Sequence, residues 1–169
     1  ENLVGFIIQR VLEKCQIELK ILERDIGKLE TIIPPFPRIT YDEAAKILKD
    51  KGSEFKYGSD FGAPDETLLS EHFDKPVMIH RWPAGIKAFY MKRDEQNNDL
   101  ALGVDMIATE GYGEIVGGGQ REDDLERLDA DRKTRVLEGK GEMVSPREEL
   151  MIVTPERRQT NVKKDVDYR

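Results

Sequence analysis

The side chains best suited to chemistry lie in one short stretch, residues 104–122. Asp105 and Glu114 stand on two predicted strands, on either side of a turn that contains glycine. A charged side chain within a sheet is costly unless it is paired or holds a cation. Two carboxylates on neighbouring strands could share Mg²⁺, which takes one or two protein carboxylates and completes its shell with water and phosphate oxygens.

Three glycines and an arginine follow the second acid. Gly117, Gly118 and Gly119 place no side chains in the way, so a ligand could approach the backbone closely. Arg121 offers a planar fork suited to a carboxylate, an amide oxygen or a phosphate. These groups together are typical of a site for an amino acid and a metal-bound nucleotide. The alternative interpretation is a half-exposed sheet on which both acids face water and the glycines form a bulge.

Composition limits the other possibilities. Apolar residues make up 38% of the 169-residue chain and charged residues 36%, as in a globular protein with a heavily solvated surface. The net charge of −7 argues against a protein whose main task is to grip phosphate backbones. A single cysteine, Cys15, excludes an internal disulfide framework and favours a cytoplasmic location. No apolar run is long enough to span a membrane. Because the chain begins with Glu1, we expect it to be a piece of a longer protein.

Helical patterns dominate the first half. Apolar residues at steps of three or four predict one long amphipathic helix over residues 1–30, which must end before the prolines of residues 34–37. A capping box that begins at Thr40 predicts a second helix, with Gly52 at its C-terminal cap. Pro64 suits the first position of a third helix.

Strand patterns follow from Lys75 onward. Short apolar or alternating stretches predict four strands: Pro76–Arg81, Ile86–Lys92, Leu100–Ile107 and Glu114–Gly118. Helices followed by consecutive strands indicate an α+β fold with an antiparallel sheet.

The composition changes again near residue 126. We expect one domain over residues 1–126 and a charged, diverged segment over residues 127–169. Within that segment only residues 150–153 resemble a strand, and the composition of residues 157–169 predicts disorder.

Four stretches resemble the asparaginyl-tRNA synthetases, in the order and with the spacing of that family. They are Pro35–Ala44, Asp60–Thr67, Ile86–Met91 and the segment from Glu110 to Arg121. The resemblance implies an incomplete class II aminoacyl-tRNA synthetase fold, in which helices flank an antiparallel sheet. It also implies activation of asparagine by ATP to an aminoacyl-adenylate and transfer of the aminoacyl group to tRNA(Asn). The longer protein would be a cytoplasmic homodimer.

The resemblance also assigns roles to single residues. Asp105 and Glu114 would hold Mg²⁺ against the ATP phosphates, with Glu114 and Arg121 as the catalytic groups. Arg121 would read the amino-acid side chain, and Gly117 and Gly118 would form the floor of the pocket. Lys87 has two interpretations, contact with substrate or pairing with a carboxylate on a neighbouring strand.

Some features depart from the family pattern. Gly119 stands where the family usually has serine, and Gly139–Val144 has the glycines of motif 3 without its arginine. Motifs 1 and 2 and the anticodon-binding barrel are missing from the 169 residues. We therefore expect the isolated fragment to be inactive. The alternatives are an aspartyl-tRNA synthetase, an asparagine synthetase-like relative, or a paralogue that binds without catalysis.

Overall fold

A computed structural model of the chain describes residues 1–137. Its contacts divide the chain into two compact units, Glu1–Leu128 and Asp129–Arg169. The strand predicted at residues 150–153, the disorder predicted for residues 157–169 and the glycines of residues 139–144 lie outside the described residues. The helix α6 (Leu125–Leu137) is the last described element. None of the described helices has the length and apolar character needed to cross a membrane.

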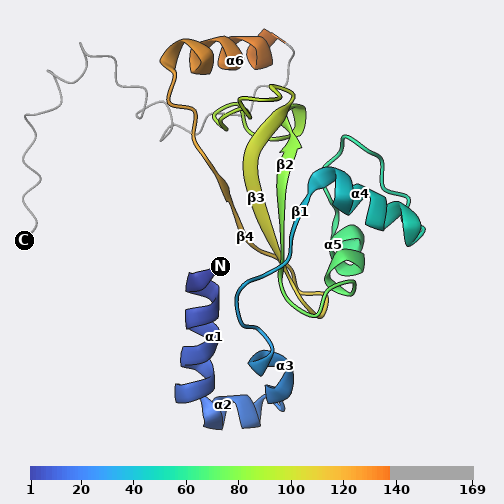
Figure 1. Cartoon of the computed structure of the whole chain (residues 1–169), viewed down its shortest axis with the longest axis vertical. Coiled ribbons are helices and arrows are strands. Elements are labelled where there is room, and N and C mark those ends of the chain that lie inside the picture. Colours follow the sequence, from blue (N-terminus) through green and yellow to red (C-terminus); the bar gives the residue numbers. More distant parts are fainter. Residues whose placement is uncertain (138–169) are drawn as a thin grey trace, which may run out of the picture. The chain divides into compact units, whose positions relative to one another are not determined.

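The first unit is built on an open, four-stranded sheet (Figure 1). Its strands follow one another in the sheet as they do in the sequence: β1 (Arg38–Thr40), β2 (Val77–Pro83), β3 (Leu100–Ala108) and β4 (Gly113–Gly119). The last three pair in the antiparallel manner expected, whereas β1 pairs with β2 in parallel. Parallel neighbours need a crossover connection, which the two helices between β1 and β2 supply. The predicted α+β fold is confirmed, with a mixed sheet.

The strand predicted over Ile86–Lys92 was wrong. The chain there forms a short 3₁₀ helix, η1 (Ala84–Ile86), followed by irregular backbone that pairs only at single residues, as Met91 does with Arg121. The reason is that β2 and β4 already occupy both edges of β3. The segment therefore bonds to the first residues of β3 and to the chain just after β4: Leu102 N donates to Lys92 O over 2.8 Å, and Lys92 N donates to Gln120 O over 2.9 Å.

The single long helix predicted for residues 1–30 was also wrong. Three helices form instead: α1 (Asn2–Lys14), α2 (Gln16–Ile21) and α3 (Ile26–Glu30). Glu23 has a left-handed φ of 51°, and Arg24 N donates to Leu19 O over 2.9 Å, which together form a Schellman C-terminal cap. Asp25 then caps the N-terminus of α3 through the N–H of Lys28. Glutamate is an unusual residue for the left-handed position, so the periodic pattern hid this turn.

The two helices between β1 and β2 form as predicted. In α4 (Tyr41–Asp50), Thr40 Oγ1 accepts from Glu43 N over 3.2 Å, and a Glu43 oxygen accepts from Thr40 N over 2.7 Å. Gly52 has a left-handed φ of 78°, which allows the chain to leave the helix sharply. In α5 (Ala63–Ser70), a proline occupies the first turn, where its missing N–H costs nothing.

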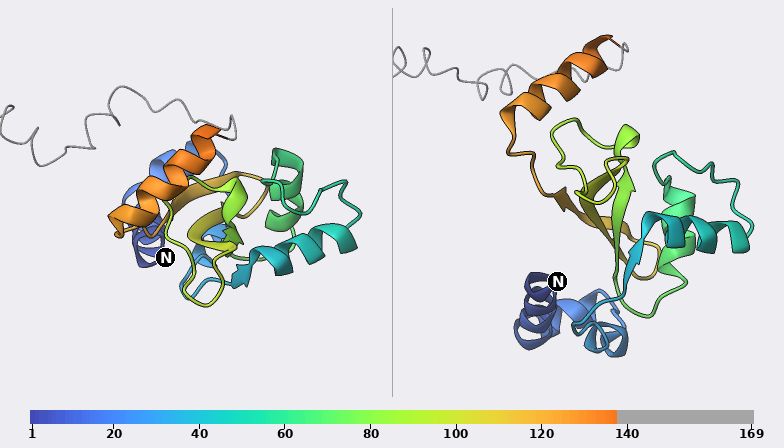
Figure 2. Two further views of the ribbon diagram at one scale, coloured as in Figure 1. Left: turned by 90° about the horizontal axis from the view of Figure 1, so that it is seen from above. Right: turned by 45° about the horizontal axis from the view of Figure 1, so that its top comes forward.

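The helices cover opposite faces of the sheet (Figure 2). On one face, Tyr41 and Leu48 of α4 and Leu69 of α5 pack on Ile107 of β3. On the other face, residues of α2 and α3 pack on Met106. Ile107 and Met106 are sequence neighbours, and they serve different clusters because successive side chains of a strand point to opposite faces.

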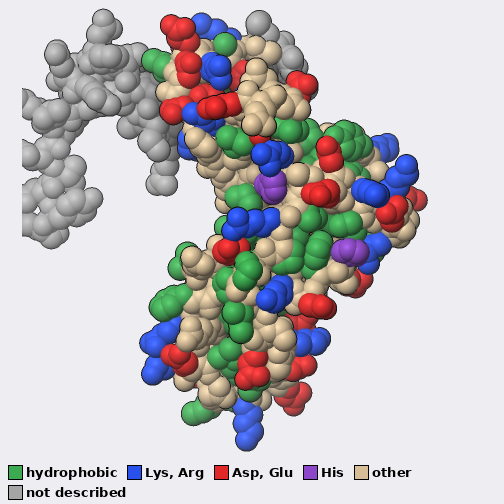
Figure 3. Space-filling view, in the orientation of Figure 1, with side chains coloured by type: hydrophobic (Ala, Val, Ile, Leu, Met, Phe, Trp, Pro, Cys, Tyr) green, Lys and Arg blue, Asp and Glu red, His purple; other side chains and the backbone are tan. Residues whose placement is uncertain are grey.

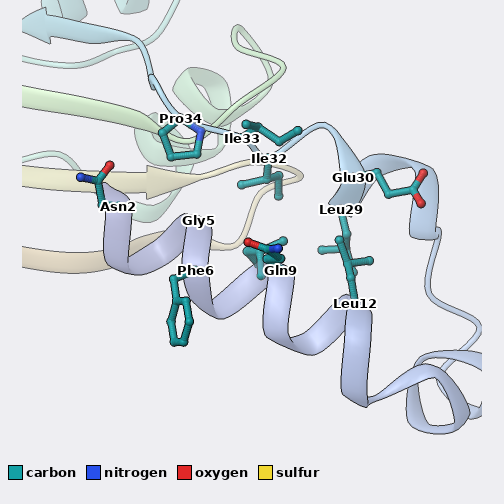
Figure 4. A pocket seen from close by; sticks show the side chains of 11 residues that line it. Asn2, Gly5, Phe6, Gln9, Leu12, Leu29, Glu30, Ile32, Ile33 and Pro34 are labelled. Atoms are coloured by element: carbon teal, nitrogen blue, oxygen red, sulfur yellow. The ribbon is translucent and has the colours of Figure 1, made fainter.

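An apolar groove of about 650 Å³ lies between α1 and the segment that leaves α3 (Figure 4). Phe6 and Leu12 line it from α1, and Ile33 and Pro34 line it from the opposite side. Figure 3 shows apolar side chains at the surface of this helical region among charged ones. The groove lies away from the acidic residues singled out in the sequence.

Candidate functional site

A β-bulge places the two predicted acids on the same face of the sheet. Asp105 is paired with Gly117, but the pairing then shifts so that Ile107 lies opposite Glu114. Ile115 is therefore the extra residue on β4. Glu114 stands three residues before Gly117, so under regular pairing it would face the opposite side, because side chains alternate along a strand. The bulge turns the Glu114 carboxylate to the face that carries Asp105.

Gly117 lies between the two carboxylates. A Cβ atom at this position would collide with Glu114 Oε1 and would lie 3.5 Å from Asp105 Oδ1. Any side chain here would therefore displace one acid, which explains why glycine is needed. Asp105 is buried and only 7% exposed, whereas Glu114 is exposed. The pair is thus anchored in the sheet and opens to solvent at the Glu114 side.

Lys87 neutralises part of this charge. Its Nζ lies 2.7 Å from Asp105 Oδ2 and 3.6 Å from Asp60 Oδ1. Of the two interpretations of Lys87, the structure shows the pairing with a carboxylate on a neighbouring strand. The same ammonium lies 3.6 Å from the centre of the Trp82 ring, a cation–π contact.

A second bulge puts Trp82 beneath this lysine. The pairing of β2 with β3 shifts between His80 and Trp82, and Arg81 has a left-handed φ of 56°. Trp82 consequently joins Ile79 on the same face of the sheet, in the cluster that contains Ile107. The indole ring is buried, so it is a fixed platform for the ammonium.

The acid pair holds more negative charge than Lys87 balances. Burial raises the pKa of the Asp105 carboxyl, although its hydrogen bond with Lys87 opposes this rise. Burial also raises the pKa of Glu114, and the charge of Asp105 raises it further. A cation between the two carboxylates would reverse both effects.

This donor set fits Mg²⁺. Among the described residues, no group of three or more acidic, histidine or cysteine side chains could hold a metal ion. Within residues 1–137, Asp105 and Glu114 would be the two carboxylates that hold it. Such a site suits Mg²⁺, which keeps several waters and takes its remaining oxygens from phosphates.

Arg121 lies two residues beyond the end of β4. Its backbone pairs with Met91, and its Cζ lies 3.9 Å from the centre of the Tyr90 ring. Alternation continued from Gly117 and Gly119 predicts that Arg121 faces the same side as Asp105. Four residues separate it from Gly117, which is about 13 Å along an extended chain. The structure therefore places the arginine near the end of β4 and does not bring it into contact with the acids.

The other two glycines have different surroundings. Gly118 pairs with Val104, on the opposite face, and a Cβ atom there would meet open space. The structure does not bring it to the acid pair. A Cβ atom on Gly119 would lie 2.7 Å from Leu102 O and 3.0 Å from Gly103 Cα. Serine, the usual residue of the resembling family at this position, would require the backbone to move.

Sequence reasoning missed two residues that touch this site. Asp60 lies beside Lys87, and Glu66 of α5 accepts a hydrogen bond from the backbone N–H of Glu114 over 3.1 Å. Both residues fall within the stretch Asp60–Thr67, which carries part of the family resemblance. Nothing in the spacing of these residues shows that Asp60 meets Lys87 or that Glu66 meets a strand 48 positions later in the chain.

An open α+β sheet with two carboxylates on one face agrees with the class that the sequence resembles. The family described as "tRNA synthetases class II (D, K and N)" matches residues 1–151. The chain therefore belongs to this family, and the resemblance is confirmed.

Its relatives in that family are asparagine--tRNA ligases. The ligase of Pelotomaculum thermopropionicum is 57% identical over 128 residues, which cover 76% of this chain and 30% of the relative. That of Sorangium cellulosum is 54% identical over 141 residues, with 76% of this chain and 32% of the relative covered. The chain thus spans about a third of the length of the curated relatives it matches.

Solved structures agree with this assignment. Asparaginyl-tRNA synthetase from Pyrococcus horikoshii, complexed with asparaginyl-adenylate, is 43% identical with a TM-score of 0.76, covering 88% of this chain and 33% of that one. Aspartyl-tRNA synthetase from Entamoeba histolytica is 26% identical with a TM-score of 0.67, covering 89% of this chain and 31% of that one.

Proposed function

We propose that this chain is part of an asparagine–tRNA ligase and carries one side of the site where asparagine reacts with ATP. The observation that carries the proposal is the placement of Asp105 and Glu114 on one sheet face, which depends on the bulge at Ile115. The names of the similar relatives support asparagine as the amino acid and tRNA(Asn) as the acceptor.

In this proposal Asp105 and Glu114 are the residues that would hold Mg²⁺. When bound, Mg²⁺ supplies positive charge against the oxygens of the ATP phosphates. Asp105 is held in place by Lys87, which remains its counter-ion within the sheet. Gly117 leaves the backbone bare between the acids, so a phosphate can approach without a clash. Contact of Lys87 itself with substrate stays a prediction.

Arg121 would orient the amino acid. Its guanidinium, stacked on Tyr90, donates hydrogen bonds to the side-chain amide oxygen of asparagine. The asparagine carboxylate then attacks the α-phosphorus of ATP, a carboxyl–phosphate bond forms, and pyrophosphate leaves. The chain needs no covalent nucleophile for this step, because positioning and charge stabilisation lower the barrier.

The remaining expectations concern the longer protein. Transfer of the aminoacyl group to tRNA(Asn) requires parts that lie outside this chain, because it spans about a third of its relatives. The half-buried Cys15 agrees with a reducing cytoplasm. The homodimer stays a prediction from the family resemblance.

A chimaera tests the proposal. The matched 128-residue segment of the Pelotomaculum thermopropionicum relative is replaced by the corresponding residues of this chain. We expect asparagine-dependent ATP–pyrophosphate exchange, reduced roughly 100-fold or more by Asp105→Ala or Glu114→Ala. Asp123→Ala, which removes an exposed acid paired with Lys92, is the matched control and leaves exchange unchanged.

Undiminished exchange in the Glu114→Ala chimaera would show that the metal assignment is wrong. Aspartate in place of asparagine tests the nearest alternative, an aspartyl-tRNA synthetase, because the chain is also similar to a solved structure of such an enzyme. Exchange that is faster with aspartate would overturn the proposed amino acid.

A further inference from the structure

The chain that joins β3 to β4 adopts left-handed backbone conformations at three residues. Glu110, Gly111 and Gly113 have φ values of 63°, 78° and 76°, all in the left-handed region. Glycine adopts this region freely, but a residue with a side chain such as Glu110 does so only at a cost. A turn of this kind needs support from outside, and Glu114 is the first residue after it.

Apolar burial does not set the register of the strand that follows. Ile115 and Val116 are 48% and 46% exposed, and the next three residues are glycines. Register is strongly specified only where one face of a strand is buried. The bulge at Ile115, which turns Glu114 toward Asp105, therefore requires another constraint.

Side chains from two helical regions supply such constraints. From α5, Ser70 Oγ accepts from Gly111 N over 2.9 Å, and Glu66 Oε2 accepts from Glu114 N over 3.1 Å. From the α2–α3 region, Arg24 and Lys28 form ion pairs with the Glu110 carboxylate. Of these contacts, the one from Glu66 acts directly on the residue that carries the functional carboxylate.

The surroundings of Glu66 agree with a backbone-holding role. A Cβ atom on Gly113 would lie 2.5 Å from Glu66 Oε2, so glycine makes room for this carboxylate. The Glu66 carboxylate is a third negative charge near Asp105 and Glu114, and its charge repels that of Glu114. This repulsion is costly unless the hydrogen bond that Glu66 accepts stabilises the strand. Hydrogen bonds from an N–H to an ionised acceptor are stronger than those between neutral groups.

We propose that Glu66 is a positioning residue: by holding the backbone N–H of Glu114, it keeps the bulge at Ile115 in the register that places the Glu114 carboxylate beside Asp105. The proposal rests on the assignment of Glu114 as a magnesium ligand. Glu66 acts through Glu114 and does not itself contact the metal or the substrate.

Two variants of the 169-residue chain test this role. Glu66→Gln keeps an acceptor oxygen, whereas Glu66→Leu removes it at similar volume. In metal-free chain followed by NMR, we expect the amide of Glu114 to exchange with deuterium about tenfold faster in Glu66→Leu, because its hydrogen bond is lost. Glu66→Gln keeps the protection. Glu71→Leu, which removes an exposed acid next to the end of the same helix, is the matched control and leaves this amide unchanged.

A titration with MgCl₂, followed by the amide shifts of residues 105 and 114, supplies the second readout. We expect an affinity about tenfold lower in Glu66→Leu, the usual effect of losing a group that orients a metal ligand, and little change in Glu66→Gln. The amide of Met106 reports on the sheet core, and its protection stays the same if the variants fold normally.

Three results would overturn the proposal. Unchanged Glu114 exchange in Glu66→Leu would show that the bond does not constrain the strand. Equal loss of protection at Met106 and Glu114 would show a general effect on the fold. Loss of Mg²⁺ affinity in Glu66→Gln with normal protection would make Glu66 a metal ligand. If the unsubstituted chain binds no Mg²⁺ while Glu66→Leu still exposes the Glu114 amide, the positioning role stands and the magnesium assignment fails.

Discussion

Lys87 is the centre of the local electrostatics. Its ammonium bonds to the buried Asp105, lies near Asp60 and rests on the ring of Trp82. With side-chain exposures of 16% and 10%, Lys87 and Asp105 form a largely desolvated pair. Removing one partner of such a pair leaves the other charge uncompensated, which costs more than the loss of an exposed ion pair.

Lys87→Met should therefore lower the free energy of unfolding by about 2 kcal/mol at pH 7, below the range for fully buried pairs because some solvent reaches this one. Saturating MgCl₂ should restore part of the loss, because a second cation can balance Asp105. Urea unfolding with and without MgCl₂ measures both effects. Lys92→Met, which breaks the pair with the exposed Asp123, is the control and should cost less than about 1 kcal/mol. Equal losses in the two variants would contradict this account.

Glu110 makes the stability of the fold depend on pH. Its ion pairs with Arg24 and Lys28 lower the pKa of this carboxyl from 4.5 to about 2. A carboxyl whose pKa is lower in the folded state stabilises the fold fully above its unfolded pKa, and this contribution is lost as the pH falls through the folded pKa.

Glu110→Gln should thus lower stability by about 1 kcal/mol at pH 6, a value reduced by solvent screening. The difference from the unsubstituted chain should shrink between pH 4.5 and pH 2, the two ends of the pKa shift. Urea midpoints across this range measure it. Glu13→Gln, in an exposed pair on α1, should show almost no difference at any pH. A difference in stability between Glu110→Gln and the unsubstituted chain that stays constant down to pH 2 would contradict the lowered pKa of Glu110.

Among the elements, the turn between α2 and α3 makes the N-terminal region compact. It brings Leu29 of α3 into the cluster that contains Leu19 of α2 and Met106 of β3. The turn depends on Glu23, which holds a conformation that suits glycine. This position is therefore suboptimal for stability.

Glu23→Gly should raise the free energy of unfolding by roughly 1 kcal/mol, because the left-handed conformation penalises any residue with a Cβ atom. Lys46→Gly, at an exposed position in the middle of α4, should lower it by about 1 kcal/mol, because glycine is a poor helix former. Thermal or urea unfolding measures both variants, and the two changes in the free energy of unfolding should have opposite signs. A destabilised Glu23→Gly chain would mean that its side chain matters more than its backbone.

The bulge in β4 is the element on which the site depends. Regular pairing would send the Asp105 and Glu114 carboxylates to opposite faces, with the sheet between them. One extra residue, Ile115, changes that outcome while most of the ladder is unaltered. The shift is compatible with the buried positions of β3, since Met106 and Ile107 keep their places in the two opposite clusters.

For the molecule as a whole, the described residues show one side of a site and an apolar surface on the N-terminal helices. Leu3, Phe6 and Ile7 of α1 are between 48% and 69% exposed. Of these, Phe6 lines the groove of Figure 4. The chain matches about a third of the length of its relatives. We therefore expect the residues that complete an adenylate site in the part of those proteins that the match does not include.

The chain alone should accordingly show no asparagine-dependent pyrophosphate exchange, whereas the chimaera described above should show it. The Glu114→Ala chimaera gives the background rate for comparison. Clear exchange by the purified 169-residue chain would contradict the expectation and would mean that the site is complete within it.

The sequence by itself determined the features that depend on near neighbours. The capping box of Thr40 and Glu43, the left-handed Gly52 and the proline in the first turn of α5 are local, so their residue types were sufficient to predict α4 and α5. The alternation along β2, β3 and β4 was equally readable. The family motifs also identified Asp105, Glu114 and Arg121 as the residues to examine.

Only the tertiary structure decided how these pieces meet. The region 86–92 has a strand-like pattern but no free edge of β3 to pair with, and Glu23 ends a helix in a conformation that its residue type disfavours. Most of all, a single unpaired residue in β4 decides whether Glu114 faces Asp105. Strand alternation is a local rule, but the position of a bulge depends on contacts between residues far apart in the chain, such as that of Glu66 with Glu114.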